Sequence, residues 1–264
     1  MRILALDVGN TSVAAALFDR SPASGAPAAT DHRTRGAVER VELDHWIALA
    51  RTHAPQRIAV GSVHRFGEAL AGALRAELPA SVVHFDRGDS FPLAADVVEP
   101  AKVGVDRLAA ALAAFTLAGG SAFVVGAGTA ITVDWVDAAR QSTPLFRGGA
   151  IVPGRRLQAH ALHARTDRLP DVLPWGNPPP LTLPGRTTEE AIRHGLDVGI
   201  PGEVEALLLE LERVAAAALP IFVSGGDAEW LAARLQSSSR PGLKLRREPF
   251  LVARGLALAA ERTS

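Results

Sequence analysis

The sequence predicts an α/β fold with at least partly parallel sheets. Short apolar runs of strand length alternate with longer helical patterns along most of the 264 residues, and this alternation is typical of such folds. A strand, a turn of small residues that includes a threonine, and a second strand occur near residues 2–19 and again near residues 122–135. This repetition indicates a duplicated fold, for which we expect domains at 1–118 and 119–264.

The first hairpin, Arg2–Asp19, organises the N-terminal half. Its two apolar runs are separated by Gly9–Ser12, residue types that tight turns use. Asp7 ends the first run, and an acid there is a hard oxygen ligand of the kind that Mg²⁺ accepts. Consecutive backbone N–H groups after a glycine can bind a phosphate. The competing interpretation is an ordinary hairpin with an Asx turn.

The remaining N-terminal segments alternate between helices and strands. Ser21–Arg35 contains prolines and a glycine and is expected to be a loop or a ragged edge strand. Apolar spacing and residue type then predict helix Val41–Thr52, strand Gln56–Val63, helix Phe66–Leu78, strand Val82–Phe85 and helix Leu108–Leu117, which Gly119 and Gly120 end.

The C-terminal half repeats this alternation. The predicted segments are strands Ala122–Val125 and Ile131–Trp135, a rigid turn at Gly148–Gly154, helix Arg155–Arg165, a surface loop at Asp171–Gly185, a capped helix opening at Thr187–Glu190, helix Glu203–Ala218, strand Ile221–Val223, a helix after Asp227, and helix Pro249–Glu261.

Composition excludes several classes of function. The 28 Lys and Arg residues balance the 28 Asp and Glu residues, so no net field attracts nucleic acid or a membrane surface. The absence of cysteine excludes disulfides, thiolate metal sites and a cysteine nucleophile. The uncharged stretch Leu108–Val133 is cut by Gly119 and Gly120, which favours a helix, a turn and a strand over a membrane span. No signal peptide is visible, and we expect a cytoplasmic protein.

Three turns at strand ends have the composition of nucleotide contacts: Asp7–Thr11, Gly126–Ala130 and Ser224–Asp227. Two hairpin turns can hold phosphates, and a Gly-Gly pair at a strand end admits a flat adenine ring. The sequence has neither a P-loop lysine motif nor a G-x-G-x-x-G turn that opens a helix after a strand.

A set of ordered motifs resembles the type III pantothenate kinases over nearly the whole chain. The motifs are Asp7–Thr11, Gly104–Arg107, Gly128–Ala130, Gly148–Gly154, Thr188–Ile192 with Gly195, and Ser224–Gly226. The resemblance implies two ribonuclease-H-like domains of the actin, Hsp70 and sugar-kinase superfold, with ATP in the nucleotide cleft between them. It also implies a homodimer and the conversion of pantothenate to 4′-phosphopantothenate, the first step of coenzyme A synthesis.

By this resemblance Asp106 is the general base that takes the proton of the pantothenate hydroxyl. A carboxylate at a helix start is stabilised as the anion by the helix dipole, and is therefore ready to accept a proton. The resemblance places the substrate against Gly104, Val105, Asp106, Arg107 and Thr188. The competing interpretations are a first-turn aspartate, a salt-bridging arginine and a helix-capping threonine.

The same resemblance assigns the ATP contacts, and it makes Asp7 the ligand of Mg²⁺. These contacts are Asp7, Val8, Gly9, Asn10, Thr11, Ser12, Thr129, Gly225 and Gly226. For Thr129, a plain turn residue is the alternative.

Two positions depart from the family pattern. Val97 stands three residues before Pro100 where the family often has tyrosine, and Gly126 stands where the family has an aspartate that binds a monovalent cation, K⁺ or NH₄⁺. This loss leaves a rival hypothesis, a non-catalytic regulatory or binding protein of the same fold. A kinase of another small alcohol is a third hypothesis.

A basic cluster follows Gly154, and we interpret it as a solvated helix face. It consists of Arg155, Arg156, His160, His163, Arg165 and Arg168.

Overall fold

The structure is a computed structural model that describes residues 1–19, 28–37, 43–138, 143–172, 184–237 and 243–263. Packing divides the chain into two compact units. The first unit comprises Met1–Val124, Asp134–Gly148 and Phe250–Ser264, and the second comprises Val125–Val133 and Gly149–Pro249. The domain division at residues 118 and 119 stays a prediction.

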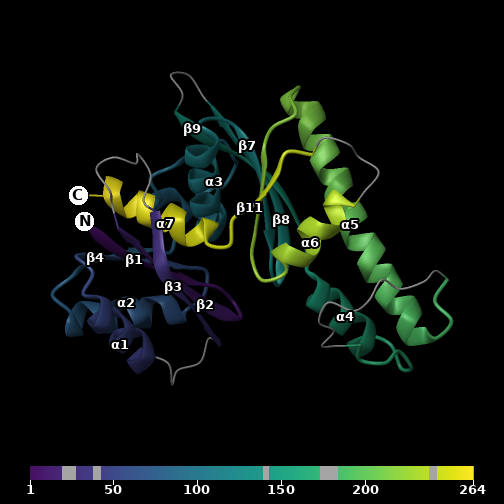
Figure 1. The fold of residues 1–264 in the computed structure, drawn as a ribbon, viewed down its shortest axis with the longest axis horizontal. Helices are drawn as coiled ribbons and strands as arrows, with labels where there is room; N and C mark the ends of the chain where they lie inside the picture. Colours follow the sequence, from purple (N-terminus) through teal and green to yellow (C-terminus); the bar gives the residue numbers. More distant parts are fainter. Residues whose placement is uncertain (20–27, 38–42, 139–142, 173–183, 238–242, 264) are drawn as a thin grey trace. The chain divides into compact units, whose positions relative to one another are not determined.

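Within the described residues, the first unit contains a five-stranded sheet in the order β3-β2-β1-β4-β5 (Figure 1). Its strands are β1 (Arg2–Val8), β2 (Ser12–Asp19), β3 (Ala28–Ala37), β4 (Arg57–Ser62) and β5 (Ser81–Phe85). β1 pairs antiparallel with β2 and parallel with β4, and β4 pairs parallel with β5. The predicted hairpin and the partly parallel sheet are confirmed. Ser21–Arg35 was expected to be a loop or a ragged edge strand, and its described part belongs to the edge strand β3.

Alternation along β1 places apolar side chains on both faces of this sheet. Leu4, Leu6 and Val8 belong to a buried cluster that is completed by helices α1 (Leu43–His53) and α2 (Phe66–Glu77). Helix α7 (Leu251–Arg262) packs on β1, β2 and β4, and α3 (Val105–Ala118) packs on α7. Figure 1 shows α1 and α2 on the opposite side of the sheet from α7.

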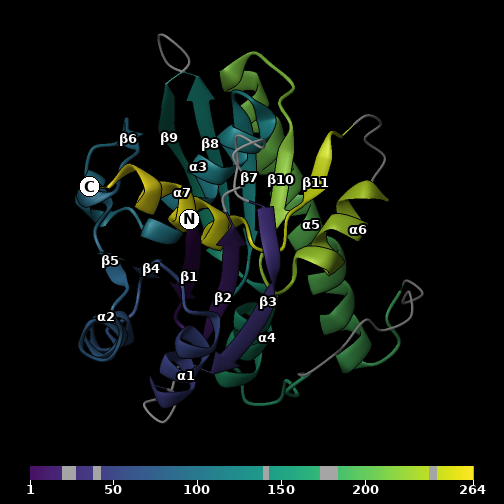
Figure 2. The ribbon, with the colours of Figure 1, turned by 60° about the vertical axis from the view of Figure 1, so that its left-hand side comes forward.

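The second sheet has six described strands in the order β11-β10-β7-β8-β9-β6 (Figure 2). They are β6 (Ala94–Ala95), β7 (Ala122–Ala127), β8 (Ala130–Ala138), β9 (Pro144–Pro153), β10 (Ile221–Ser224) and β11 (Leu245–Arg247). The sequence did not predict β6 or β11, because two or three residues carry too little pattern to be recognised as a strand.

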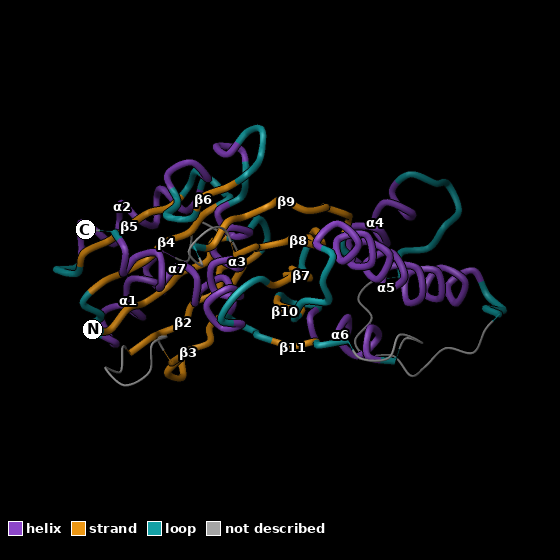
Figure 3. Tube along the Cα trace, turned by 90° about the horizontal axis from the view of Figure 1, so that it is seen from above, coloured by secondary structure: helices purple, strands orange, loops and turns teal. Residues whose placement is uncertain are grey.

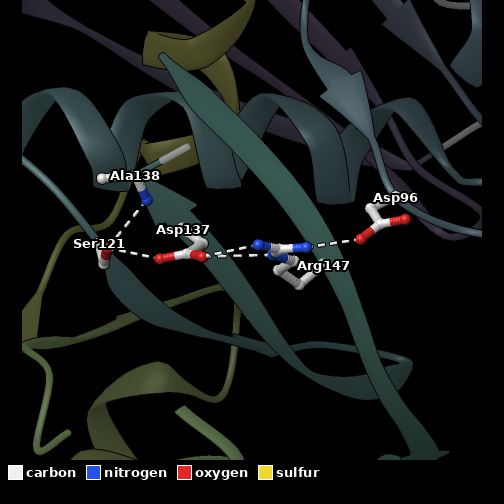
Figure 4. A network of polar contacts seen from close by, with 5 residues as sticks. All are labelled: Asp96, Ser121, Asp137, Ala138 and Arg147. Atoms are coloured by element: carbon white, nitrogen blue, oxygen red, sulfur yellow. Dashed lines mark hydrogen bonds and ion pairs between the residues drawn. The ribbon is translucent and has the colours of Figure 1, made fainter. Parts of the chain in front are cut away.

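An ion-pair network joins β6, β8 and β9 in the first unit (Figure 4). Arg147 on β9 contacts Asp137 on β8, with 3.0 Å between Nη2 and Oδ2, and also contacts Asp96 beside β6. Ser121 donates to the other oxygen of Asp137 over 2.9 Å. These ion pairs are partly exposed, so we expect them to contribute little to the free energy of unfolding. We assign them a role in fixing the register of strands β6, β8 and β9.

The predicted rigid turn at Gly148–Gly154 is wrong, since residues 148–153 continue strand β9 and the chain leaves the sheet only at Gly154. Gly148 has a φ of 88° within this strand, a value that glycine adopts at little cost. Several glycines and a proline indicated a turn, but pairing in the sheet decided the conformation.

Among its described residues, the second unit contains the helices α4 (Arg155–Ala164), α5 (Thr188–Ala215) and α6 (Ala228–Gln236). Helices α4 and α5 pack against each other, and Figure 3 shows them side by side. Thr187 and Glu190 form a capping box that opens α5, as the sequence predicted. Of the loop predicted at 171–185, residues 173–183 lie outside the described residues, and the rest belong to no helix or strand. Two short 3₁₀ helices, Gly88–Ser90 and Pro100–Lys102, belong to the first unit.

The separate helix predicted at Glu203–Ala218 is instead the second half of α5, which continues through Pro201 and ends at Ala215. Proline inside a helix costs about 3 kcal/mol relative to alanine. Ile200, Pro201 and Val204 are buried, and this apolar packing offsets the cost. In the described part of the chain, no helix has the length and apolar character needed to cross a membrane.

Gly255 generates a stability prediction because α7 approaches the backbone of α3 there. A Cβ at Gly255 would lie 1.8 Å from the carbonyl oxygen of Ala109, so Gly255→Ala forces the two helices apart. We expect the free energy of unfolding in urea to fall by about 1–3 kcal/mol, the usual cost of overpacking.

The matched control is Gly199→Ala in α5, where a Cβ would meet nothing within 4 Å. Alanine is the better helix former by about 0.5–1 kcal/mol, so this variant should be slightly more stable. Equal changes in the two variants would contradict the close approach.

Candidate active site

In the first unit, the predicted phosphate turn lies at the carboxyl end of β1. The Gly9 N–H donates to the Ser12 carbonyl over 3.0 Å, which closes the turn, while Asn10, Thr11 and Ser12 are exposed and Asp7 is partly exposed. Ligands of open α/β sheets bind at the carboxyl ends of strands, so this turn is placed where a ligand can reach it.

The turn and the predicted substrate segment are linked through Val63, directly after β4. The Val63 N–H donates to the carbonyl of Val8 over 3.2 Å. A Cγ atom of Val63 lies 3.5 Å from the position of a Cβ at Gly104. The structure therefore gathers the residues around Val8 and Gly104 into one neighbourhood of the first unit.

Asp106 lies in the first turn of α3, with Gly104 as the N-cap residue and Val105 fully buried. The Arg107 N–H donates to Oδ1 of Asp106 over 2.9 Å. The expected net stabilisation of the Asp106 anion at the helix start is wrong, because burial raises the pKa of this carboxyl above its usual range. The Arg107 N–H and charge oppose this only in part. A raised pKa makes this carboxylate a stronger proton acceptor than an exposed aspartate.

Arg107 is engaged by Asp134 on β8, a residue that the sequence analysis missed. Its Nε lies 3.1 Å from Oδ1 and 3.2 Å from Oδ2, and its Nη2 also contacts Oδ1. The Arg107 side chain is 15% exposed and that of Asp134 only 1%. An acid between the apolar residues Val133 and Trp135 in a predicted strand was the available signal, because a buried charge needs a partner.

In the second unit, three glycine-containing turns meet through their backbones. The Gly154 N–H donates to the Thr129 carbonyl over 2.9 Å, and the Asp227 N–H donates to the Ala127 carbonyl over 3.0 Å. A Cβ at Gly225, which has a φ of 108°, would lie 2.3 Å from the Ala127 carbonyl oxygen. Thr129 and Gly226 are exposed beside this junction, so two of the predicted ATP-binding segments are brought together.

The space that a side chain would use at position 126 is occupied by Thr132. The Thr132 hydroxyl lies 2.8 Å from the position of a Cβ at Gly126. A neutral hydroxyl thus stands where the family pattern has a carboxylate, and these two residues do not fit a cation site of the family's kind.

The basic cluster needs one correction. Arg155 is buried and pairs with Asp227, so it is wrong to count it with the solvated helix face. The other five members are exposed, as predicted. Burial of Arg155 depends on a residue 72 positions away, which no local pattern reveals.

Thr188 is exposed in the first turn of α5, and the neighbouring Thr187 supplies the cap. The capping role that competed for Thr188 therefore belongs to Thr187. No described contact brings Thr188 to the three turns above, so its role in substrate binding stays a prediction.

Two places in the first unit offer ligands for a divalent cation. Asp7 supplies one carboxylate at the phosphate turn, which suits Mg²⁺, because that ion takes one or two carboxylates together with substrate phosphates. Glu68, His84 and Asp86 present ligand atoms within 4.8 Å of one another. In that group Nδ1 of His84 lies 3.0 Å from the Glu68 carboxylate, so a direct contact between these two side chains already accounts for their proximity.

Comparison with known proteins identifies relatives of the whole chain. A model of the family described as type III pantothenate kinase matches residues 3–210. A type III pantothenate kinase of Rhodopirellula baltica is 34% identical, and the alignment covers 95% of this chain and 96% of that protein.

Solved structures show the fold. A Baf family protein of Campylobacter jejuni has a TM-score of 0.58 at 18% identity, with 98% of each chain covered. A glucokinase of an Antarctic psychrotroph has a TM-score of 0.52 at 14% identity, with 99% of each chain covered. These likenesses confirm the predicted ATPase fold that actin, Hsp70 and sugar kinases share.

Asp134→Ala tests the buried pair. Removing one partner leaves the Arg107 charge buried without compensation, and we expect the free energy of unfolding to fall by about 3–5 kcal/mol. The measurement is urea denaturation followed by circular dichroism.

Asp19→Ala is the control, because it also removes an Arg–Asp pair, 3.1 Å long, but with side chains that are 46% and 45% exposed. An exposed pair contributes about 0–1 kcal/mol. Similar losses in the two variants would refute the importance of burial at Asp134.

Proposed function

Because the chain belongs to the type III pantothenate kinase family, we propose that it transfers the γ-phosphoryl group of ATP to the hydroxyl of pantothenate. The product, 4′-phosphopantothenate, is the first intermediate on the route to coenzyme A. The observation that carries this proposal beyond family membership is Asp106, a carboxylate whose pKa is raised by burial at the start of α3.

We assign Asp106 the role of general base. Its Oδ1 accepts the Arg107 N–H, so we assign the substrate proton to Oδ2. As the pantothenate hydroxyl oxygen attacks the γ-phosphorus of ATP, its proton passes to Oδ2 of Asp106. The bond between the γ-phosphorus and the oxygen that bridges it to the β-phosphorus breaks, and ADP leaves. Positioning and charge neutralisation supply most of the catalysis in such transfers, and the contacts of Asp106 fix its position.

Arg107 contributes to this role by holding the helix start. Two of its nitrogens are committed to Asp134, so we assign it chiefly to orienting Asp106 and the adjacent backbone of Gly104 and Val105. Thr188, exposed and not used as a cap, is our candidate for a direct hydrogen bond to pantothenate.

We assign the nucleotide to the glycine-containing turns. In the first unit, the close backbone at Val8 and Gly9, the N–H groups after Gly9 and the hydroxyls of Thr11 and Ser12 suit phosphates. In the second unit, the Thr129 hydroxyl suits a phosphate, and Gly225 and Gly226 leave room for the adenine ring. Asp7 is our candidate ligand for Mg²⁺, which would neutralise phosphate charge. The fold and the family support ATP and a divalent metal in general, and the identity of the metal is part of the proposal.

We further propose a cytoplasmic homodimer. Location follows from the need for ATP and for a metabolic substrate. For dimerisation, the support is family resemblance together with the exposed apolar side chains Val198, Leu209 and Val214 on α5, which are 60%, 47% and 63% exposed. Light scattering coupled to gel filtration measures the mass directly.

A coupled ADP-release assay tests the reaction, with pantothenate, glucose and glycerol offered as acceptors. Activity with pantothenate alone is the expected outcome. Activity with another alcohol would reassign the substrate, and no activity with any acceptor would favour the regulatory-protein hypothesis, which draws no support from the relatives found.

Asp106→Asn tests the general base. The amide cannot accept the proton, so kcat should fall by about 10²–10⁴-fold while the fold and ATP binding remain. An ordinary aspartate has a pKa of about 3.9. Because the pKa of Asp106 is raised, its carboxylate becomes protonated, and stops acting as a base, at a higher pH than an ordinary aspartate would. The rate should therefore fall as pH decreases through this raised value. Turnover near the wild-type value in the variant would remove Asp106 from the mechanism.

The rate in K⁺ compared with Na⁺ or Li⁺ tests position 126. Since Gly126 offers no carboxylate and the Thr132 hydroxyl occupies the space, we expect little difference between the three cations. Gly126→Asp together with Thr132→Ala restores the acid and makes room for it, so this variant should gain activation by K⁺. Strong, selective K⁺ activation of the wild type would contradict this expectation.

A further inference from the structure

A buried ion pair in the second unit joins two of the turns assigned to the nucleotide. Arg155 begins α4 directly after Gly154, and Asp227 directly follows Gly225 and Gly226. Nη2 of Arg155 lies 3.0 Å from Oδ1 of Asp227, and the side chains are 9% and 18% exposed. Charges this deeply buried are tolerated only when paired, so each residue restricts where the other can lie.

Two backbone hydrogen bonds connect three turns, and the ion pair closes them into a ring. Gly154 donates to Thr129, and Asp227 donates to Ala127, over 2.9 and 3.0 Å. The Arg155–Asp227 pair closes the third side, between the turns at 154 and 227. Each turn is thereby tied to both of the others, and the side-chain pair is the one tie that the backbone does not make.

The Asp227 side chain pairs with Arg155 and does not cap helix α6. Asp227 is the N-cap residue of α6, yet its side chain makes no capping hydrogen bond. Aspartate is among the preferred N-cap residues because its carboxylate accepts the orphan N–H groups of the first turn. A local rule that is broken without a local gain is expected at functional positions.

Trp230 fixes the guanidinium from its other side. The Arg155 Cζ lies 4.7 Å from the centroid of the Trp230 ring, a cation–π distance. The ring is itself held by its Nε1–H, which donates to Oδ1 of Asp197 on α5 over 2.9 Å. Only a flat guanidinium can both stack on the ring and reach Asp227, so lysine cannot reproduce the arrangement.

We propose that Arg155 and Asp227 are positioning residues for nucleotide binding. Their pair holds Gly225 and Gly226 against the Ala127–Thr129 turn, in the arrangement that receives the adenine ring and the phosphates. Asp227 is only two residues from Gly225, so its negative charge alone would repel a bound polyphosphate. The positive charge of Arg155 compensates for it. This inference rests on the proposed function, and it adds two residues that act through the backbone rather than by touching the nucleotide.

Asp227→Asn and Arg155→Lys test the pair, with Mg-ATP as the ligand. Calorimetry gives Kd for Mg-ATP without catalysis, and steady-state assays give kcat and the KM for each substrate. Because a small misplacement of binding groups is costly, we expect Kd and KM for ATP to rise by about 10- to 100-fold. KM for pantothenate should not change. The double variant should lose no more than the worse single variant, since both remove one interaction.

Asp137→Asn is the matched control. It breaks the partly buried pair with Arg147 in the first unit, which spans 3.0 Å (Figure 4), and should leave the KM for ATP unchanged. Melting temperatures of all variants separate a general loss of stability from a specific loss of nucleotide binding.

The outcomes distinguish this inference from the function it rests on. If the wild type binds Mg-ATP and the variants bind it equally well, the positioning role is refuted and the proposed kinase stands. A parallel rise of both KM values with a fall in melting temperature would reduce the pair to a structural role and also refute it. Failure of the wild type to bind Mg-ATP would overturn the proposed function and this inference together.

Discussion

The buried pair between Arg107 and Asp134 is the interaction that holds the start of α3, and with it the proposed general base, to strand β8. Arg107 binds β8 through its guanidinium and Asp106 through its backbone N–H, so one residue connects the candidate base to a sheet strand. Each charge alone would be costly to bury, and together they are tolerated because two N–H donors satisfy the carboxylate. Helix α3 therefore begins at a defined place, with its first-turn acid held still.

The second unit achieves similar rigidity with glycine. At Gly154 and Gly225 the backbone comes so close to the Gly128 and Ala127 carbonyls that a Cβ would lie 2.1 and 2.3 Å from their oxygens. Backbone groups can then hydrogen-bond between turns and still leave N–H groups and flat surfaces for a ligand. The turns are small-residue segments because of this crowding, and the Arg155–Asp227 pair adds the one side-chain tie.

Electrostatics give the two units different parts in the proposed reaction. Burial raises the pKa of Asp106, which favours proton acceptance, and Asp7 is the proposed ligand for a divalent metal in the same unit. In the second unit Asp227 is paired with Arg155, and position 126 is a glycine that supplies no carboxylate. In the proposed reaction, the turns of the second unit therefore present backbone dipoles rather than these carboxylates to the nucleotide, which suits an anionic ligand.

The sequence by itself determined the features that depend on neighbours along the chain. The Arg2–Asp19 hairpin, a helix that contains Leu108–Leu117 and the Thr187–Glu190 capping box follow from turn chemistry and periodicity. Tertiary structure decided the rest. Strand β9 replaced a predicted turn, α5 continued through Pro201, and Asp134 and Arg155 found partners 27 and 72 positions away. Sheet pairing, apolar burial and the pairing of buried charges join distant segments, and local pattern carries no information about which distant segment will be met.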